Sequence, residues 1–239
     1  MLLKLEDVTK RFGGLLALNK FDMTVKKGEI VGLIGPNGAG KTTAYNVITG
    51  VYPPDGGTIQ FNGETITKFK PWNICKKGIA RTFQLVKPFL NMTVLENTMV
   101  GALVRTNDVE EAREKAEKIL EFVGLHEKRN LHARVLNLVD RKLMEVARSL
   151  STEPTLLLLD EAMAGLNPAE IDVALKLFRE IRDTHGITLV VVEHVMRAVM
   201  GLSERIVVIH EGRRIAEGTP KEVSKEAAVI TAYLGTEAL

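Results

Sequence analysis

The sequence lacks the features that would place the chain outside the cell or within a membrane. Its single cysteine, Cys75, excludes an internal disulfide and favours a reducing compartment. No apolar run approaches the ~18 residues that a membrane-spanning helix needs, and the longest, 187–192, ends at Glu193. The first seven residues are too short and too charged a stretch for a secretion signal. We therefore expect any membrane role to depend on a partner protein.

Charge of neither sign is in excess. The chain carries 32 Lys and Arg residues against 30 Asp and Glu residues, and it has a net charge of +2. This balance gives no reason to expect binding to nucleic acid or to an acidic lipid surface. With 239 residues and 45% hydrophobic content, the chain can form a full core, so we expect one domain, or one domain with a subdomain.

One segment matches the phosphate-loop pattern Gly-x-x-x-x-Gly-Lys-Ser/Thr at every fixed position. An apolar strand precedes it and a helical stretch follows it, which is the context the motif requires. Glycines let successive N–H groups point at an anion, Lys41 can reach the β- and γ-phosphates, and Thr42 can bind Mg²⁺. The alternative, a glycine-rich turn with a chance lysine, does not explain this order. The candidate nucleotide-binding residues are Gly35, Pro36, Asn37, Gly38, Ala39, Gly40, Lys41, Thr42 and Thr43.

Strands and helices alternate along most of the chain, which predicts an α/β fold with a mostly parallel sheet covered by helices on both faces. A one-face apolar pattern predicts a helix near 169–183. Continuous apolar runs suit strands that are buried on both faces. Such runs occur at 30–34, 156–159, 188–192 and 206–209.

The middle third of the chain reads differently, as a run of helices. Residues 93–96 form a capping box, and 110–123 and 140–150 show one-face apolar patterns. We therefore expect a helical insertion near 87–151 that interrupts the α/β core. Further on, Glu211 and Gly212 predict the turn of a C-terminal hairpin.

Two carboxylates, Asp160 and Glu161, follow the apolar run at 156–159. At a strand end beside a phosphate loop, a nucleotide-hydrolysing site needs groups to coordinate Mg²⁺ and a base for the attacking water. We assign Asp160 to the metal, directly or through water, and Glu161 to the water. The alternative is a pair of helix-capping carboxylates, and the phosphate loop favours the functional role.

A second buried strand ends in a polar pair, Glu193 and His194. A lone histidine in this position is usually structural. Beside a phosphate loop, however, His194 can hydrogen-bond the γ-phosphate, and we favour that role. The remaining histidines lack such a context, and we expect them to be structural or on the surface.

These motifs occur in the order found in ABC-transporter ATPases, and the resemblance covers essentially the whole chain. It implies a P-loop NTPase fold in a single ABC ATPase domain over 1–239, with an N-terminal antiparallel β part and an inserted helical subdomain. The implied parts are a RecA-like core at about 1–86 and 152–210, a helical subdomain at about 87–151, and a C-terminal hairpin and helix at about 211–239. ATP and Mg²⁺ are the implied ligands.

Finer motifs resemble the branched-chain amino acid importer ATPases. They lie at 11–15, 78–84, 92–97 and 229–235. Two alternatives remain open. An ATPase of a lipid or polysaccharide ABC exporter has a similar tail, and a soluble non-transport ABC ATPase has the same chemistry. The second would usually carry tandem domains, long inserts or basic extensions, which this sequence does not show.

The resemblance also implies roles for residues outside the phosphate loop. Phe12 stacks on adenine, although ordinary packing at a strand end is an alternative reading. Gln84 contacts Mg²⁺ or water and connects the core to the helical insertion. Residues 87–90 dock transmembrane permease subunits, or instead form an apolar staple for the next helix. Residues 164–167 form the loop that crosses to a second ATPase subunit.

The family signature Leu-Ser-Gly-Gly-Gln is largely missing. Counting back from the Ala147–Arg148 pair leads to 136–140, where only Leu136 matches. The signature normally binds the γ-phosphate of ATP held by the other subunit. Asn137 can cap the helix and donate an amide bond, but Asp140 would repel a phosphate at ~6 Å by on the order of 3 kcal/mol at an effective dielectric near 20. Alternatively, the two residues form a capping pair whose helix still offers N–H groups to ATP.

The resemblance and the altered signature together predict the partners. We expect a peripheral protein at the cytoplasmic face of the inner or plasma membrane, bound to permease subunits. A periplasmic or extracellular solute-binding protein would act indirectly, and no nucleic acid is expected. We expect the second ATPase subunit to be a different chain with an intact signature, which makes the pair a heterodimer.

Overall fold

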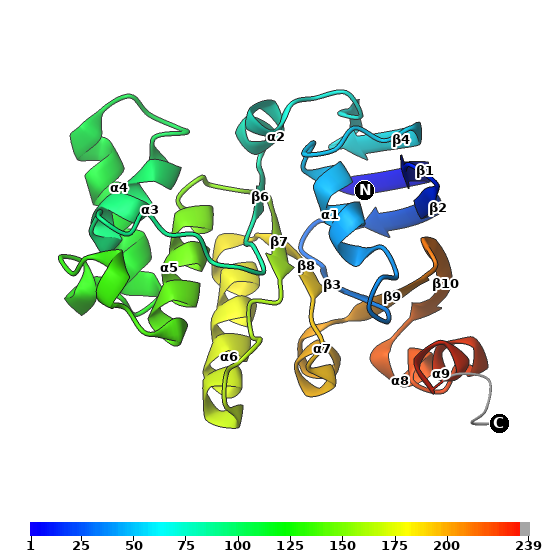
Figure 1. The fold of residues 1–239 in the computed structure, drawn as a ribbon. Coiled ribbons are helices and arrows are strands. Elements are labelled where there is room, and N and C mark those ends of the chain that lie inside the picture. Colours follow the sequence, from blue (N-terminus) through cyan, green and yellow to red (C-terminus); the bar gives the residue numbers. More distant parts are fainter. Residues whose placement is uncertain (235–239) are drawn as a thin grey trace.

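The computed structural model describes residues 1–234, and their strands form two sheets (Figure 1). The larger sheet is parallel except for an antiparallel edge strand, as the alternating pattern predicted. Its order is β10 (Arg213–Gly218), β9 (Arg205–His210), β3 (Ile30–Ile34), β8 (Thr188–Val192), β7 (Leu156–Asp160) and β6 (Ile79–Arg81). The smaller, antiparallel sheet has the order β2 (Leu15–Val25), β1 (Leu3–Phe12), β4 (Gly56–Phe61) and β5 (Glu64–Thr65).

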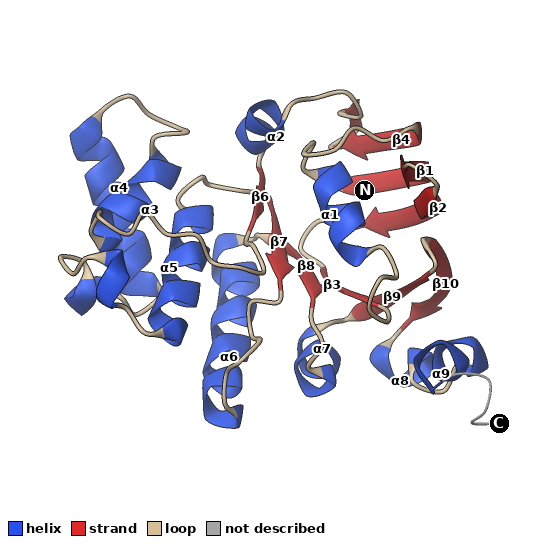
Figure 2. Ribbon diagram, in the orientation of Figure 1, coloured by secondary structure: helices blue, strands red, loops and turns tan. Residues whose placement is uncertain are grey.

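Helices lie on both faces of the larger sheet and in a separate group beside it (Figure 2). In Figure 1, α3 (Val94–Ala102), α4 (Val109–Phe122) and α5 (Leu138–Leu150) gather on the side opposite the antiparallel sheet. Two short 3₁₀ turns, His126–Lys128 and Ala133–Val135, connect α4 to α5. The helices are α1 (Lys41–Ile48), α2 (Pro71–Lys77), α3 (Val94–Ala102), α4 (Val109–Phe122), α5 (Leu138–Leu150), α6 (Pro168–His185), α7 (Met196–Leu202), α8 (Pro220–Val223) and α9 (Ala227–Leu234).

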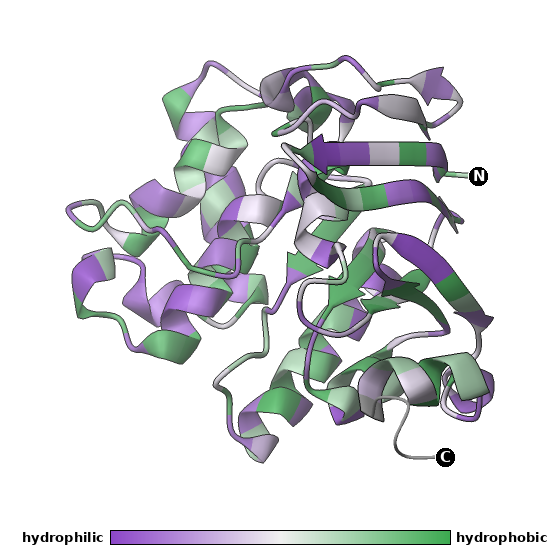
Figure 3. Cartoon of the chain, turned by 45° about the vertical axis from the view of Figure 1, so that its right-hand side comes forward, coloured by the Kyte–Doolittle hydropathy of each residue, from purple (hydrophilic) through white to green (hydrophobic). Residues whose placement is uncertain are grey.

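The central strands β3, β7 and β8 are buried at every residue, which explains their continuous apolar runs. Alternate side chains enter different cores. Leu157 and Leu159 pack with α5 and α6, whereas Leu156 and Leu158 pack with α1 and the antiparallel sheet. In Figure 3 the central strands are green and therefore hydrophobic, whereas the outer strands are of mixed colour. The sheet is therefore held rigidly between two apolar layers.

The predicted elements occur with small shifts at their ends. The capping box at Thr93 and Glu96 is present, and the predicted hairpin turn joins β9 to β10. The helix predicted at 140–150 begins two residues earlier, because the Asn137 side chain accepts a hydrogen bond from the Asp140 N–H and so caps the helix. Part of the predicted C-terminal segment, 235–239, lies outside the described residues.

The carboxyl ends of three parallel strands meet at one edge of the larger sheet. The phosphate loop follows β3, Asp160 ends β7, and Glu193 follows β8. Ligands of open α/β sheets bind at this edge. The topology thus brings the phosphate loop, Asp160 and Glu193, which are distant in the sequence, to the same edge of the sheet.

Candidate nucleotide-binding and hydrolysis site

The phosphate loop is tightly packed against neighbouring backbone. A Cβ on Gly35 would lie 2.1 Å from the Ile209 carbonyl oxygen, and one on Gly40 would lie 2.6 Å from the Ala17 carbonyl oxygen. Gly40 also has φ +111° and occupies the N-cap of α1, where a side chain would be strained. Both glycines are therefore required by the shape of the loop itself.

Lys41, the first residue of α1, turns its side chain back into the loop. Its Nζ donates hydrogen bonds to the carbonyl oxygens of Gly35 at 2.7 Å and Pro36 at 3.0 Å. Burial lowers the pKa of Lys41, and the negative charges of Glu161 and Asp160 act against that shift. The ammonium group is thus held where phosphate oxygens would meet the loop N–H groups.

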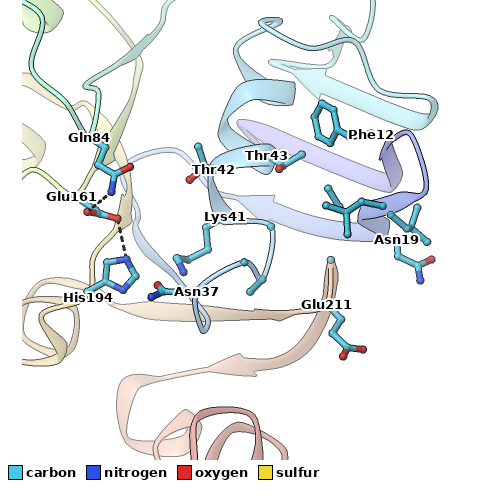
Figure 4. A pocket seen from close by; sticks show the side chains of 17 residues that line it. Phe12, Asn19, Asn37, Lys41, Thr42, Thr43, Gln84, Glu161, His194 and Glu211 are labelled. Carbon is cyan, nitrogen blue, oxygen red and sulfur yellow. Dashed lines mark hydrogen bonds and ion pairs between the residues drawn. The ribbon is translucent and has the colours of Figure 1, made fainter.

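A cavity of about 850 Å³ opens above the loop (Figure 4). It brings Phe12 together with the loop residues 37–43, Gln84, Glu161 and His194. In Figure 4 the polar side chains of Gln84, Glu161 and His194 lie on one side of Lys41 and the Phe12 ring lies on the other. The cavity therefore has an aromatic end and a carboxylate end. The other residues that line it are Leu15, Leu16, Ala17, Asn19, Glu211 and Gly212.

The Glu161 side chain lies between those of Gln84 and His194, two residues that the sequence analysis had predicted to be in the site. Its Oε2 accepts a hydrogen bond from Gln84 Nε2 at 2.9 Å, and its Oε1 lies 2.9 Å from His194 Nε2 (Figure 4). Glu161 has a left-handed backbone, φ +50°, and its N–H donates to the Val192 carbonyl at 2.8 Å. This unusual backbone turns the carboxylate into the cavity at the end of β7.

Asp160 is buried beside this carboxylate and forms an ion pair that the sequence reasoning did not foresee. Arg81 Nη2 lies 2.6 Å from Asp160 Oδ2, and both side chains are almost fully buried. Burial raises the pKa of the Asp160 carboxyl, while the Arg81 hydrogen bond and charge lower it. Arg81 also donates to Asn46 Oδ1 at 2.6 Å and stacks between the rings of Tyr45 and Phe83. Arg81 lies within the family-like motif at 78–84, but nothing in that motif indicated its pairing with Asp160.

The three predicted metal ligands line a second cavity that adjoins the first. Thr42, Gln84 and Asp160 all contribute to its wall, although Asp160 does not line the larger cavity. Hydroxyl, amide and carboxylate oxygens are ligands that suit Mg²⁺. This donor set fits Mg²⁺, and Thr42, Gln84 and Asp160 are the residues that would hold the ion.

Phe12 is not ordinary core packing at a strand end. Its side chain is 40% exposed, and its ring makes an edge contact with Tyr52 at a centroid distance of 5.2 Å. Lys10 Nζ lies 5.6 Å from the same ring. The ring is therefore supported from behind and open toward the cavity.

The signature position lies away from this cavity. Asn137 and Asp140 form the capping pair, with Asp140 N–H donating to Asn137 Oδ1 at 2.8 Å. The Asp140 carboxylate is 2.6 Å from Lys128 Nζ, and the residue is only 8% exposed. This ion pair places a positive charge directly beside Asp140, which acts against the repulsion expected between Asp140 and a phosphate. Asn137 and the apolar Leu138 are both exposed at this end of α5.

The segment after Gln84 exposes apolar groups. Phe89 and Leu90 are each 49% exposed, which does not support a fully buried staple. The main chain at Phe89 is tied to Asn97 of α3, and Arg148 of α5 lies over the Phe89 ring. An apolar patch is thus fixed to the helical group beside the site.

Comparison with known proteins places these features in a family. A family model described as "ABC transporter" matches residues 18–164, well over half of the chain. The chain belongs to the ABC transporter ATP-binding proteins. A second model, "Branched-chain amino acid ATP-binding cassette transporter", matches residues 213–238 of this ABC protein.

Full-length relatives and solved structures agree with this family. The chain is 41% identical to the high-affinity branched-chain amino acid transport ATP-binding proteins BraF of Pseudomonas aeruginosa and LivG of Escherichia coli, over 98% of each chain. The crystal structure of the ADP conformation of the ABC cassette MJ1267 matches with a TM-score of 0.88 and 33% identity, over 98% of both chains. A dimeric structure of the ABC cassette MJ0796 matches with a TM-score of 0.83 and 25% identity, over 91% of this chain and 98% of that one.

Proposed function

We propose that this ABC protein is the ATP-hydrolysing, energy-coupling subunit of an importer for branched-chain or related amino acids. The names of its full-length relatives and the match at residues 213–238 support the substrate class. The observation that carries the hydrolytic role is the placement of Glu161, which Gln84 and His194 hold at the carboxylate end of the phosphate-loop cavity.

In this proposal, each part of the cavity handles one part of ATP. Phe12 stacks on adenine, while the loop N–H groups, Lys41 and Thr43 bind the phosphates. Glu161 accepts a proton from the attacking water, and His194 hydrogen-bonds the γ-phosphate. Mg²⁺, held by Thr42, Gln84 and Asp160, would neutralise charge on the phosphate oxygens.

Removing the Phe12 ring tests the aromatic end of the cavity. Base stacking on an aromatic side chain is worth about 1–3 kcal/mol, so Phe12→Ala should weaken ATP binding roughly 5- to 150-fold. Equilibrium titration with ATP measures the change. Trp72→Ala is the control, because Trp72 is an exposed aromatic that does not line the cavity. Equal affinities for both variants would remove Phe12 from the binding site.

The partners follow from the exposed surface and the relatives. Among residues 1–234, no helix is both long and apolar enough to cross a bilayer. We propose that the apolar segment 87–90 docks a transmembrane permease subunit and that the protein is peripheral on the cytoplasmic side. Copurification tests this role: the chain should retain permease subunits and stimulate amino-acid uptake in reconstituted vesicles. Copurification with an export system instead would reject import.

We further propose that two different ATPase chains make the working pair. Each ATP site of an ABC dimer combines a phosphate loop from one chain with a signature from the other. This chain supplies a complete first half, but Leu138 and Val139 stand where glycines would allow close backbone approach. A homodimer would contain two weakened sites. With an intact partner, this chain's own nucleotide would meet a complete signature, whereas the partner's nucleotide would not.

Restoring the signature tests the heterodimer. A variant with Asn137→Ser, Leu138→Gly, Val139→Gly and Asp140→Gln should raise ATP hydrolysis by the isolated protein at high concentration, because two copies could then complement each other. Steady-state phosphate release measures the effect. Lys128→Ala is the control, because it breaks the Asp140 ion pair without restoring the signature. An unchanged rate in the four-residue variant would contradict the proposed defect.

A further inference from the structure

A buried lysine of α5 contacts the main chain of the catalytic residue. Lys142 is 9% exposed, and its Nζ donates a hydrogen bond to the Glu161 carbonyl oxygen at 2.8 Å. Burial lowers the pKa of Lys142, while Glu193, Glu145 and Glu161 act against the shift. Burying an ammonium group costs free energy. A buried lysine that donates to a main-chain carbonyl is therefore expected to have a structural role at that carbonyl.

The main chain at Glu161 has an unfavourable conformation that a hydrogen bond from Lys142 can stabilise. A non-glycine residue at φ +50° is strained, and it persists only when its surroundings fix it. The Glu161 N–H is fixed by the Val192 carbonyl at the end of β8. On the other side, the Glu161 carbonyl accepts from Lys142 and, at 3.2 Å, from the Ala164 N–H. The Glu161 main chain is thus held by hydrogen bonds on both sides, and Lys142 supplies one of them from its side chain.

Residues 162–164, which follow Glu161, are also held by a hydrogen bond to a residue at the end of β8. The Met163 N–H donates to the Glu193 carboxylate at 2.6 Å, and Glu193 is 3% exposed. Its other oxygen, Oε2, has no hydrogen-bond partner among the described residues. Burial raises the pKa of the Glu193 carboxyl to about 7, and the Met163 N–H and the Lys142 charge act against that shift. The loop after β7 is consequently fixed by polar groups from two different elements.

Helix α5 meets this loop both through the polar contact of Lys142 and through apolar side chains. An apolar cavity of about 250 Å³ lies beside Lys142, lined by Val139, Leu143, Ala162 and Leu166 among others. Toward the start of α5, Leu138 Cδ2 lies 3.1 Å from where a Cβ on Gly165 would stand. Lys142 follows the Asn137 cap by roughly 7 Å along the helix at 1.5 Å per residue. One helix thus touches the loop both near the signature position, through Leu138, and at the main chain of Glu161, through Lys142.

We propose that Lys142 is a positioning residue for hydrolysis: it holds the Glu161 main chain in its left-handed conformation and so aims the carboxylate at the attacking water. The inference rests on the proposed role of Glu161 as the base. It also puts α5, whose N-terminal end carries the signature position, in direct contact with the hydrolytic residue of the same chain.

Four proteins test this inference in the assembled transporter: the wild type, Lys142→Met, Lys142→Arg and Arg141→Met. Misplacement of a reacting group by about 1 Å costs roughly 100-fold, so Lys142→Met should lower kcat about 10- to 100-fold. ATP affinity should change less than about twofold, because the phosphate loop is untouched. Lys142→Arg keeps a donor and should recover part of kcat. Arg141→Met is the matched control, because Arg141 donates to the Arg134 carbonyl and not to the loop.

A second readout reports the main chain itself. Amide hydrogen exchange over residues 160–164 should be faster in Lys142→Met than in the wild type and close to the wild type in Arg141→Met. Wild-type kcat in Lys142→Met, an equal loss in Arg141→Met, or a parallel loss of ATP binding would overturn the inference. Glu161→Gln, measured alongside, separates the two proposals. If it stays active, the proposed base is wrong; if it is inactive while Lys142→Met is normal, only the positioning role fails.

Discussion

Glu161→Gln should bind ATP normally and fail to hydrolyse it. A glutamine side chain can accept from Gln84 through its oxygen and donate to His194 through its nitrogen, so both contacts of Glu161 can be kept. It cannot take a proton from water. General base catalysis contributes about 10²- to 10⁴-fold, and we expect kcat in the assembled transporter to fall by that factor. The variant should also hold the ATPase pair closed around ATP.

The measurement is phosphate release under saturating ATP, with ATP binding determined on the same preparation. Asp172→Asn is the control, because Asp172 is a carboxylate that pairs with Arg197 on the outside of α6. It should match the wild type in both assays. Hydrolysis at the wild-type rate by Glu161→Gln would show that another group activates the water.

Lys41→Ala should abolish tight ATP binding. The ammonium group lies inside the phosphate loop, and each charge-assisted hydrogen bond to phosphate contributes about 1.5–3 kcal/mol. Two such bonds correspond to a loss of roughly 10²- to 10⁴-fold in affinity. The fall should appear in equilibrium binding as well as in turnover, unlike the effect of Glu161→Gln.

Lys4→Ala provides the comparison for this variant. Lys4 pairs with Glu6 on an exposed part of β1, so its loss should leave ATP affinity unchanged. Thermal unfolding of both variants checks that the fold is kept. Near-normal ATP affinity in a folded Lys41→Ala protein would show that the phosphate loop does not bind ATP as proposed.

Local patterns predicted the fold well because each one reports a local physical cause. The buried strands β3 and β8 begin and end where their apolar runs do. The capping box at Thr93 and Glu96 marked the start of α3. The start of α5 was missed by two residues, because the helix was placed from its apolar pattern at 140–150, although Asn137 was named as a possible cap. Ends of elements depend on single side chains and are harder to infer than apolar periodicity.

The sequence predicted contacts within the site only between residues that belong to recognisable motifs. Gln84, Glu161 and His194 come together because they follow strands of one sheet. The ion pair between Arg81 and Asp160 joins residues 79 positions apart, and no local pattern relates them. The same holds for Lys142, whose partner is a main-chain carbonyl with no sequence signal. The repulsion expected from Asp140 also depended on a partner, Lys128, that only the fold reveals.

The most direct test of the account is the ATPase rate of the purified single chain, measured across a range of protein concentrations and compared with the assembled transporter. We propose that this chain has a complete phosphate-loop site but needs a signature from a different subunit. This proposal predicts tight ATP binding and little hydrolysis by the chain alone, with no rise in specific activity as its concentration increases, and rapid hydrolysis in the transporter. Brisk hydrolysis by the single chain that rises cooperatively with its concentration would contradict it.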